Sequence, residues 1–224
     1  MAEAEPVQSS PTLGAVVMVA MFGMFGAWHG VAALFGPTET NLGHPAITET
    51  AFFAAIGWFM GSTLAFARRG EPGTEVTPES ARVVYTWGCA MCLLHVAVAF
   101  HLGHGWSHAA AWKHTKQTGG YGDGIFVNYL FALVWLADVV WAWVAFDSYL
   151  NRSKWIGRAV YGFTGFVVFN ASVVFAAGFV RAVCALFFLS LAVMAWKEWR
   201  RQSEGERGAY APPLRDQPPF ALLL

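Results

Sequence analysis

The stretch IFVNYLFALVWLADVVWAWVAF runs from Ile125 to Phe146 and contains one charged side chain, Asp138. An α-helix rises 1.5 Å per residue, so about 20 apolar residues cross the hydrocarbon core of a bilayer. Soluble domains rarely contain an apolar run of this length. The stretch therefore predicts a membrane-spanning helix at 125–146 and indicates an integral membrane protein in contact with lipid.

The composition of the whole chain agrees with this prediction. Hydrophobic residues make up 56% of the 224 residues and charged residues 12%, and the formal net charge is zero. A net charge of zero does not favour nucleic acid as a partner. Its three cysteines do not form the pattern of a secreted disulfide framework. These observations leave a helical membrane protein as the expected class.

Further apolar stretches predict five more spans, near 13–35, 51–67, 83–102, 159–177 and 182–196. As a single helix, the run 159–196 would be about 57 Å long, so we divide it near Gly178 and Arg181 with a tight turn between the halves. No Lys or Arg precedes the first span, so it lacks the basic start of a cleaved signal peptide and is expected to be retained. The expected fold is all-α, a bundle of about six transmembrane helices in one domain, 1–201.

Basic residues orient this predicted bundle. Of the 14 Lys and Arg residues, all but Lys113, Lys116 and Arg181 fall in the segments that would share one side with both termini. Cytoplasmic loops carry the excess of basic residues, so we expect both termini in the cytoplasm, which agrees with an even number of spans. The expected location is a bacterial inner membrane. The tail 202–224, with its paired prolines, is expected to be disordered and cytoplasmic.

Two histidines lie at matching depths in this arrangement. His29 and His95 each lie roughly 10 Å below the outer end of an outward-running span, and Asn170 lies at a similar depth in the fifth. Two imidazoles from different helices at one level suit the two axial positions of a haem b, with Asn170 bonding a propionate. Polar residues in membrane bundles also hold helices together through hydrogen bonds, and that alternative stays open.

The remaining histidines lie in or beside the outer loops. His101, His104 and His108 would share one face if the third helix continued, and imidazoles so placed suit Zn, Cu or Fe. One helix rarely supplies three ligands to a metal, so we expect His44, His114, Glu39 or Asp123 to complete such a site. An interfacial helix with its aromatic residues at the headgroup level is the alternative interpretation.

Asp138 and a cysteine pair are the other reactive groups in the predicted spans. A carboxylate within a membrane is a candidate for proton relay. No basic residue lies at its level in the spans, so Asp138 is expected to be protonated, or bonded to Ser62, Thr63 or a tyrosine. The spacing of Cys89 and Cys92 lacks the adjacent histidine of the covalent haem motif, which favours a packing role.

Three functions follow from these features. The first is a haem b or metal site in the outer half that serves electron transfer, with a quinol or an external redox partner. The second is a metal-dependent membrane enzyme or metal-handling protein that uses the outer-loop histidines. The third is a non-catalytic subunit or scaffold whose partners are other membrane subunits. The sequence does not decide whether the protein is an enzyme.

Overall fold

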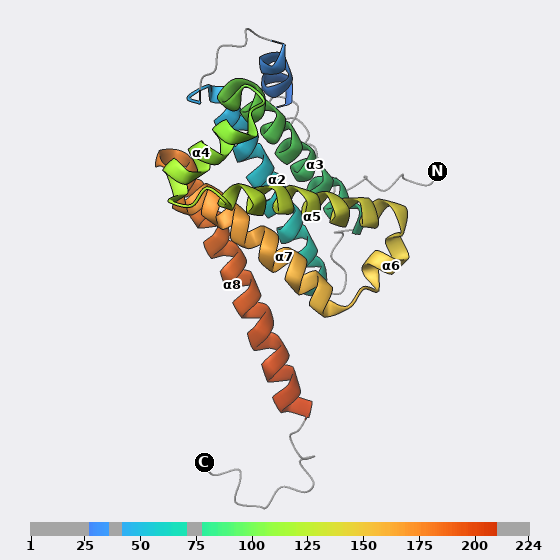
Figure 1. Cartoon of the computed structure of the whole chain (residues 1–224). Helices are drawn as coiled ribbons and strands as arrows, with labels where there is room; N and C mark the ends of the chain where they lie inside the picture. The colour runs from blue at the N-terminus through green and yellow to red at the C-terminus, as the bar shows by residue number, and fades with distance from the viewer. Residues whose placement is uncertain (1–26, 36–41, 71–77, 210–224) are drawn as a thin grey trace, which may run out of the picture. The chain divides into compact units, whose positions relative to one another are not determined.

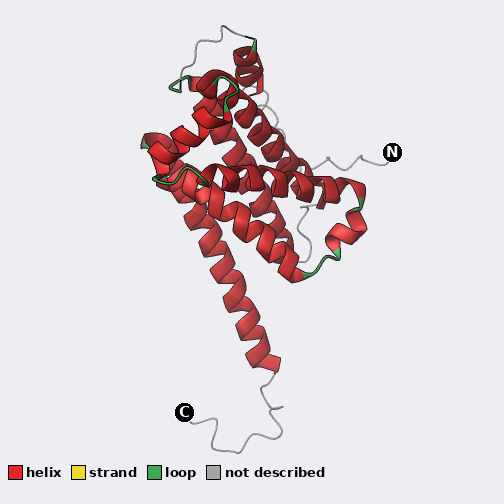
Figure 2. Ribbon diagram, in the orientation of Figure 1, coloured by secondary structure: helices red, strands yellow, loops and turns green. Residues whose placement is uncertain are grey.

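The computed structural model describes residues 27–35, 42–70 and 78–209. The described residues form helices and turns and contain no strand (Figure 2). The all-helical prediction is therefore confirmed for this part of the chain. The chain divides into two compact units, Met1–Phe188 and Leu189–Leu224.

The helices follow one another with short connections (Figure 1). A short helical segment at 27–34 comes first. The elements after it are α2 (Pro45–Gly70), α3 (Pro78–Val98), η1 (Ala99–Gly103), α4 (His108–Gly119), α5 (Gly124–Val144), α6 (Phe146–Leu150), α7 (Lys154–Phe169), η2 (Asn170–Val174) and α8 (Gly178–Ala209). Both η elements are single π-helical turns, which insert an extra residue into a helix and frequently occur at functional sites.

Three of the described helices are long and apolar enough to cross a membrane, namely Ser80–Gly103, Gly124–Val144 and Gly178–Arg201. They overlap the predicted spans 83–102, 125–146 and 182–196. The predicted span 51–67 lies within α2, and the part of 13–35 before residue 27 lies outside the described residues. The chain therefore has apolar helices of membrane-spanning length, and the full count of six stays a prediction.

The long apolar run 159–196 is interrupted at residues 175–177, between η2 and α8. The helix begins again at Gly178, whose φ of +56° is a left-handed conformation that glycine adopts without a steric penalty. Helix α8 continues past Arg201 to Ala209, so the prediction of disorder from residue 202 is wrong for 202–209. Lys, Glu, Gln and Arg have high helix propensity, which explains the continuation. Residues 210–224 lie outside the described part.

Glycines bring α2 and α3 into close backbone contact (Figure 1). A Cβ on Gly57 would lie 2.3 Å from the Cα of Gly88, and a Cβ on Gly61 would lie 2.9 Å from the Cβ of Tyr85. Small residues spaced four apart let two membrane helices approach in this way. This contact sets the rotation of α2 and α3 relative to each other.

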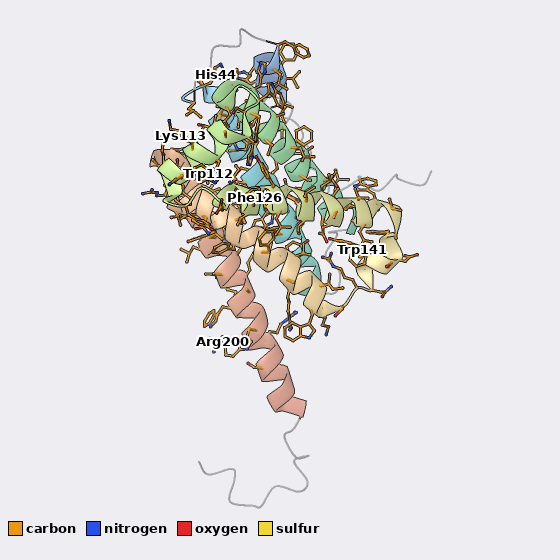
Figure 3. The ribbon with its side chains drawn as sticks, viewed as in Figure 1. His44, Trp112, Lys113, Phe126, Trp141 and Arg200 are labelled. Carbon is orange, nitrogen blue, oxygen red and sulfur yellow. The ribbon has the colours of Figure 1, made fainter. Side chains whose placement is uncertain are left out.

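Aromatic contacts show that α3 and α5 run antiparallel. Near one end the rings of Phe100 and Tyr129 lie 6.3 Å apart, and near the other Arg82 lies 4.1 Å above the Trp143 ring. We call these the α4 end and the α6 end of unit Met1–Phe188, after the short helices beside them. Helix α5 joins the two ends: Figure 3 shows Phe126 close to α4 and Trp141 close to α6.

Candidate functional site

The histidines of the chain gather at the α4 end. His29 lies in the short segment 27–34, and His44 precedes α2. The others belong to the last turns of α3, to η1 and to the α4 region, and they are His95, His101, His104, His108 and His114. The antiparallel packing of α2, α3 and α5 brings these segments to one end of the unit. The grouping supports the prediction that any histidine chemistry is concentrated in one place.

A turn between η1 and α4 decides which of these histidines meet. Gly105 and Trp106 both have positive φ, 54° and 60°, and the Ser107 hydroxyl then caps the start of α4. The third helix therefore does not continue beyond η1. The expectation that His101, His104 and His108 share one helical face is wrong, because the chain reverses between His104 and His108.

The turn instead brings together His104 and His114, whose ring centroids lie 5.5 Å apart with an interplanar angle of 48°. The Phe100 ring contacts His104 edge-on at 5.7 Å. Burial lowers the pKa of His104, and the neighbouring His114 lowers it further. The lowered pKa favours the neutral imidazole, which keeps a lone pair on one ring nitrogen. His114 is one of the four residues that the sequence analysis offered to complete a site with these histidines, and the metal site itself stays a prediction.

His101 and His108 have other partners. The indole N–H of Trp106 donates to His101 Nδ1 at 3.1 Å, which leaves the proton of a neutral imidazole on Nε2. The Nδ1 atom of His108 lies 2.9 Å from the Tyr129 hydroxyl on α5. These two contacts orient the rings toward aromatic neighbours.

The two histidines proposed for haem both contact the first turns of α2. His29 Nδ1 lies 3.1 Å from a Glu49 carboxylate oxygen. His95 Nδ1 donates to the backbone carbonyl of Ile47 at 2.9 Å, and the Thr50 hydroxyl lies 3.4 Å from the same nitrogen. A carbonyl that accepts from Nδ1 leaves the lone pair on Nε2, as in many histidine ligands of metals.

The space beside His29 is narrow. A Cβ on Gly30 would lie 2.8 Å from both Leu94 Cδ2 and Thr50 Cγ2, so the helical segment packs directly on α2 and α3 at this level. A porphyrin therefore does not fit at Gly30 without moving these side chains. The Asn170 amide donates to the Phe166 carbonyl of its own helix at 2.8 Å, so its side chain is not directed at the two histidines by any contact described.

His44 and Asp123 have local roles. The backbone N–H of Ala46 donates to His44 Nδ1 at 3.2 Å, a capping contact at the start of α2. Asp123 Oδ1 accepts the indole N–H of Trp112 at 2.9 Å, and this bond lowers the pKa of the carboxyl. Figure 3 shows His44, Trp112 and Lys113 at the α4 end. Glu39 lies outside the described residues.

Asp138 lies at the α6 end and is 4% exposed. It accepts hydrogen bonds from Arg152 and, at 3.2 Å, from the Tyr149 hydroxyl. The tyrosine partner agrees with the sequence expectation. The expectation that Asp138 has no basic partner is wrong, because the chain turns back at α6 and the loop after it brings Arg152 to Asp138. Burial alone lowers the pKa of Arg152, but the adjacent carboxylate outweighs it, so the net shift is upward.

Two partners were missed by sequence reasoning. Glu49 lies before the predicted span 51–67, so the sequence did not indicate it as a partner of His29; a helix start at Pro45 is the signal that would have included it. Arg152 lies between the predicted spans 125–146 and 159–177, among the basic residues that orient the bundle, and no sequence pattern indicated it as a partner of Asp138. Cys89, Cys92 and Cys184 are free and buried, in agreement with a packing role.

Among the described residues, no group of three or more His, Cys, Asp or Glu side chains is arranged to hold a metal ion. The His104–His114 pair is not such a group, because it contains two side chains. No family model, curated protein or solved structure matches this chain.

Proposed function

We propose that this chain is a polytopic protein of the bacterial cytoplasmic membrane that binds a transition-metal ion, zinc, copper or iron, through His104 and His114. The observation that carries the proposal is the contact of the two rings at 5.5 Å. Two imidazoles on one tetrahedral zinc, each bound through a nitrogen about 2.0–2.1 Å away, have centroids roughly 5 Å apart. A small adjustment of either ring then suffices for joint ligation.

The protonation of the pair supports the same proposal. Metal ligands must be deprotonated, and the lowered pKa of His104 keeps its imidazole neutral. Two protein ligands leave positions for water or a substrate, which suits metal handling or metal-dependent catalysis better than a closed structural site. Basic residues at the α6 end, such as Arg82 and Arg152, favour an orientation with the α4 end away from the cytoplasm and both termini inside.

The test measures metal binding by the purified full chain in nanodiscs. Titration with Co²⁺ followed by visible absorption, and elemental analysis after dialysis against Zn²⁺ or Cu²⁺, report ligation directly. Substitution of His104 or His114 by Ala should weaken binding by more than the 10–100-fold typical for loss of an outer-shell partner. His108→Ala is the matched control, since His108 is an exposed histidine of the same region bonded to Tyr129. Unchanged binding in the double variant would refute the proposal.

A haem b between His29 and His95 is the second candidate. It is favoured by the Ile47 carbonyl, which directs the lone pair of His95 to Nε2, and opposed by the close packing at Gly30. A Soret band in protein produced with excess haem, lost in His95→Ala, would support it. A colourless folded protein under these conditions would leave His29 and His95 as hydrogen-bonding groups between helices, as expected of a non-catalytic subunit.

A further inference from the structure

The start of α7 carries two exposed basic side chains beside an exposed tryptophan. Lys154 and Arg158 have no carboxylate within ion-pair distance among the described residues. Trp155, between them in the sequence, is 74% exposed, and Ile156 is 43% exposed. The guanidinium of Arg158 lies 5.2 Å from the centroid of the Trp155 ring. We call these four residues the α7 basic patch.

Two arginines near the patch are held by the protein itself. Arg152 is bound in the buried ion pair with Asp138. The guanidinium of Arg82 lies 4.1 Å from the centroid of the Trp143 ring and 4.2 Å from that of Phe146. The α7 basic patch differs from them, because no carboxylate or carbonyl of the described residues holds its two cations.

The ion pair also indicates the level of the patch relative to the apolar helices. The membrane-length helix Gly124–Val144 contains Asp138 about 9 Å before its end. Arg152 reaches Asp138 with its side chain, so the backbone at Arg152 lies near the level at which α5 ends. Helix α7 begins just after Arg152 (Figure 1). In a membrane crossed by α5, the start of α7 therefore lies at the level of the lipid headgroups.

We propose that the α7 basic patch binds the headgroup of an anionic phospholipid. Phosphate oxygens complement the two cations, and basic residues next to a membrane span attract anionic lipids. Exposed tryptophan suits the boundary between headgroups and acyl chains. Asp147 on α6 is exposed and forms no ion pair with either cation, so segment 146–158 has two exposed cations and one exposed carboxylate. This inference rests on the membrane location in the proposed function, and it does not depend on metal binding.

Helix α4 offers a matched comparison. Lys113 and Lys116 are exposed, and the Lys116 ammonium lies 5.2 Å from the centroid of the Trp112 ring. The indole N–H of Trp112 donates to Asp123 at 2.9 Å, so a carboxylate lies beside this tryptophan. The α4 surface thus has two cations and the same kind of ring contact, but its carboxylate repels an anionic phosphate. We therefore expect the α4 lysines to contribute less to lipid binding.

The test counts lipids bound to the full chain by native mass spectrometry. The protein is purified in a neutral detergent with equimolar phosphatidylglycerol and phosphatidylcholine, and the wild type should retain phosphatidylglycerol in preference. Lys154→Gln/Arg158→Gln should lower the apparent affinity for phosphatidylglycerol about 25-fold, or about fivefold for each cation removed, and leave phosphatidylcholine unchanged. Should this double variant not fold, Arg158→Gln alone carries the test, with a loss of about fivefold.

Two further variants separate this site from a general effect of charge. Lys113→Gln/Lys116→Gln removes the same charge from α4 and should stay close to the wild type. Lys154→Arg/Arg158→Lys keeps both cations and should keep the preference. Equal losses in the α4 and α7 variants, no loss in the α7 variant, or equal retention of the two lipids by the wild type would overturn the proposal.

Competition and extraction complete the experiment. Displacement of phosphatidylglycerol by an equal concentration of deca-glutamate would assign the patch to an acidic protein segment and overturn the proposal. A chain that alkaline carbonate releases from liposomes would refute the membrane location and this inference with it. A chain that stays in the liposomes but shows no preference for phosphatidylglycerol would refute this inference alone.

Discussion

Asp138 and Arg152 form an ion pair whose side chains are 2% and 9% exposed, although Arg152 belongs to the loop between α6 and α7. The arginine also lies 4.0 Å above the ring of Tyr149, which donates to the same carboxylate. Two charges removed from water require each other, because a single unpaired charge in this environment is very unfavourable. The pair therefore connects α5, α6 and the start of α7.

Removing one member of the pair should destabilise the protein strongly. Arg152→Ala leaves the Asp138 carboxylate without its cation, and we expect a loss of about 3–5 kcal/mol in the free energy of unfolding. Denaturant titration in detergent, followed by circular dichroism, measures the loss. Arg158→Ala is the control, since Arg158 is exposed and should change stability by no more than about 0.5 kcal/mol. Equal effects of the two substitutions would contradict the assignment of the ion pair.

The glycine contact between α2 and α3 should not accept a methyl group. In Gly57→Ala the new Cβ would lie 2.3 Å from Gly88 Cα, so the helices must separate, at a cost of about 1–3 kcal/mol or more. Thermal unfolding in detergent compares this variant with Gly162→Ala on α7, where a Cβ meets nothing within 4 Å. The control should gain roughly 0.5–1 kcal/mol, because alanine favours a helix over glycine. A neutral Gly57→Ala would show that this contact is absent.

The Trp58–Thr164 hydrogen bond should contribute to the packing of α2 on α7. Thr164→Val keeps the shape but leaves the buried indole N–H of Trp58 unpaired, which costs about 1–3 kcal/mol. Trp58→Phe also loses the bond, so the double variant should be less destabilised than the sum of the two single variants. Additive losses measured by chemical unfolding would indicate that the two side chains do not interact.

The protonation of His104 should occur below the ordinary histidine range. Its pKa is lowered by burial and by His114, so the folded protein favours the neutral imidazole. The neutral imidazole of His104 therefore contributes fully to the free energy of unfolding at pH values above about 6.5, its pKa in the unfolded chain. This contribution is lost as the pH falls from there through the lower pKa of His104 in the folded protein. Histidine NMR titration of the metal-free protein measures the pKa of His104. In His114→Ala this pKa should still lie below the ordinary value, but the shift should be smaller, because burial remains and the effect of His114 is lost. A midpoint above 6.5 would contradict it.

Local features of the structure could be predicted from sequence because they depend on neighbouring residues. The apolar run around Asp138 predicts a helix, and α5 covers Gly124–Val144. The interruption near Gly178 follows from chain length and from the conformational freedom of glycine. Depth arguments for His29 and His95 are of the same kind, because they count residues along a helix. They direct attention to His29 and His95, and in the structure both contact the first turns of α2.

The partners of the histidines could not be predicted in the same way. His104 meets His114 because the chain reverses at Gly105–Trp106, and a continuous helix would have separated the two residues by about 15 Å. Arg152 reaches Asp138 because α6 is only five residues long. Both contacts depend on the path of a few loop residues, which hydrophobic periodicity does not describe.

By itself, the sequence determined that this chain is helical, apolar enough to lie in a membrane, and rich in histidine in a few neighbouring segments. These properties follow from the composition of the chain and from the spacing of residues within one or two helical turns. Only the tertiary structure decided which imidazoles meet and which carboxylate has a cation. Such pairings depend on the rotation of each helix about its axis, and that rotation is set by contacts between distant residues such as Gly57 and Gly88.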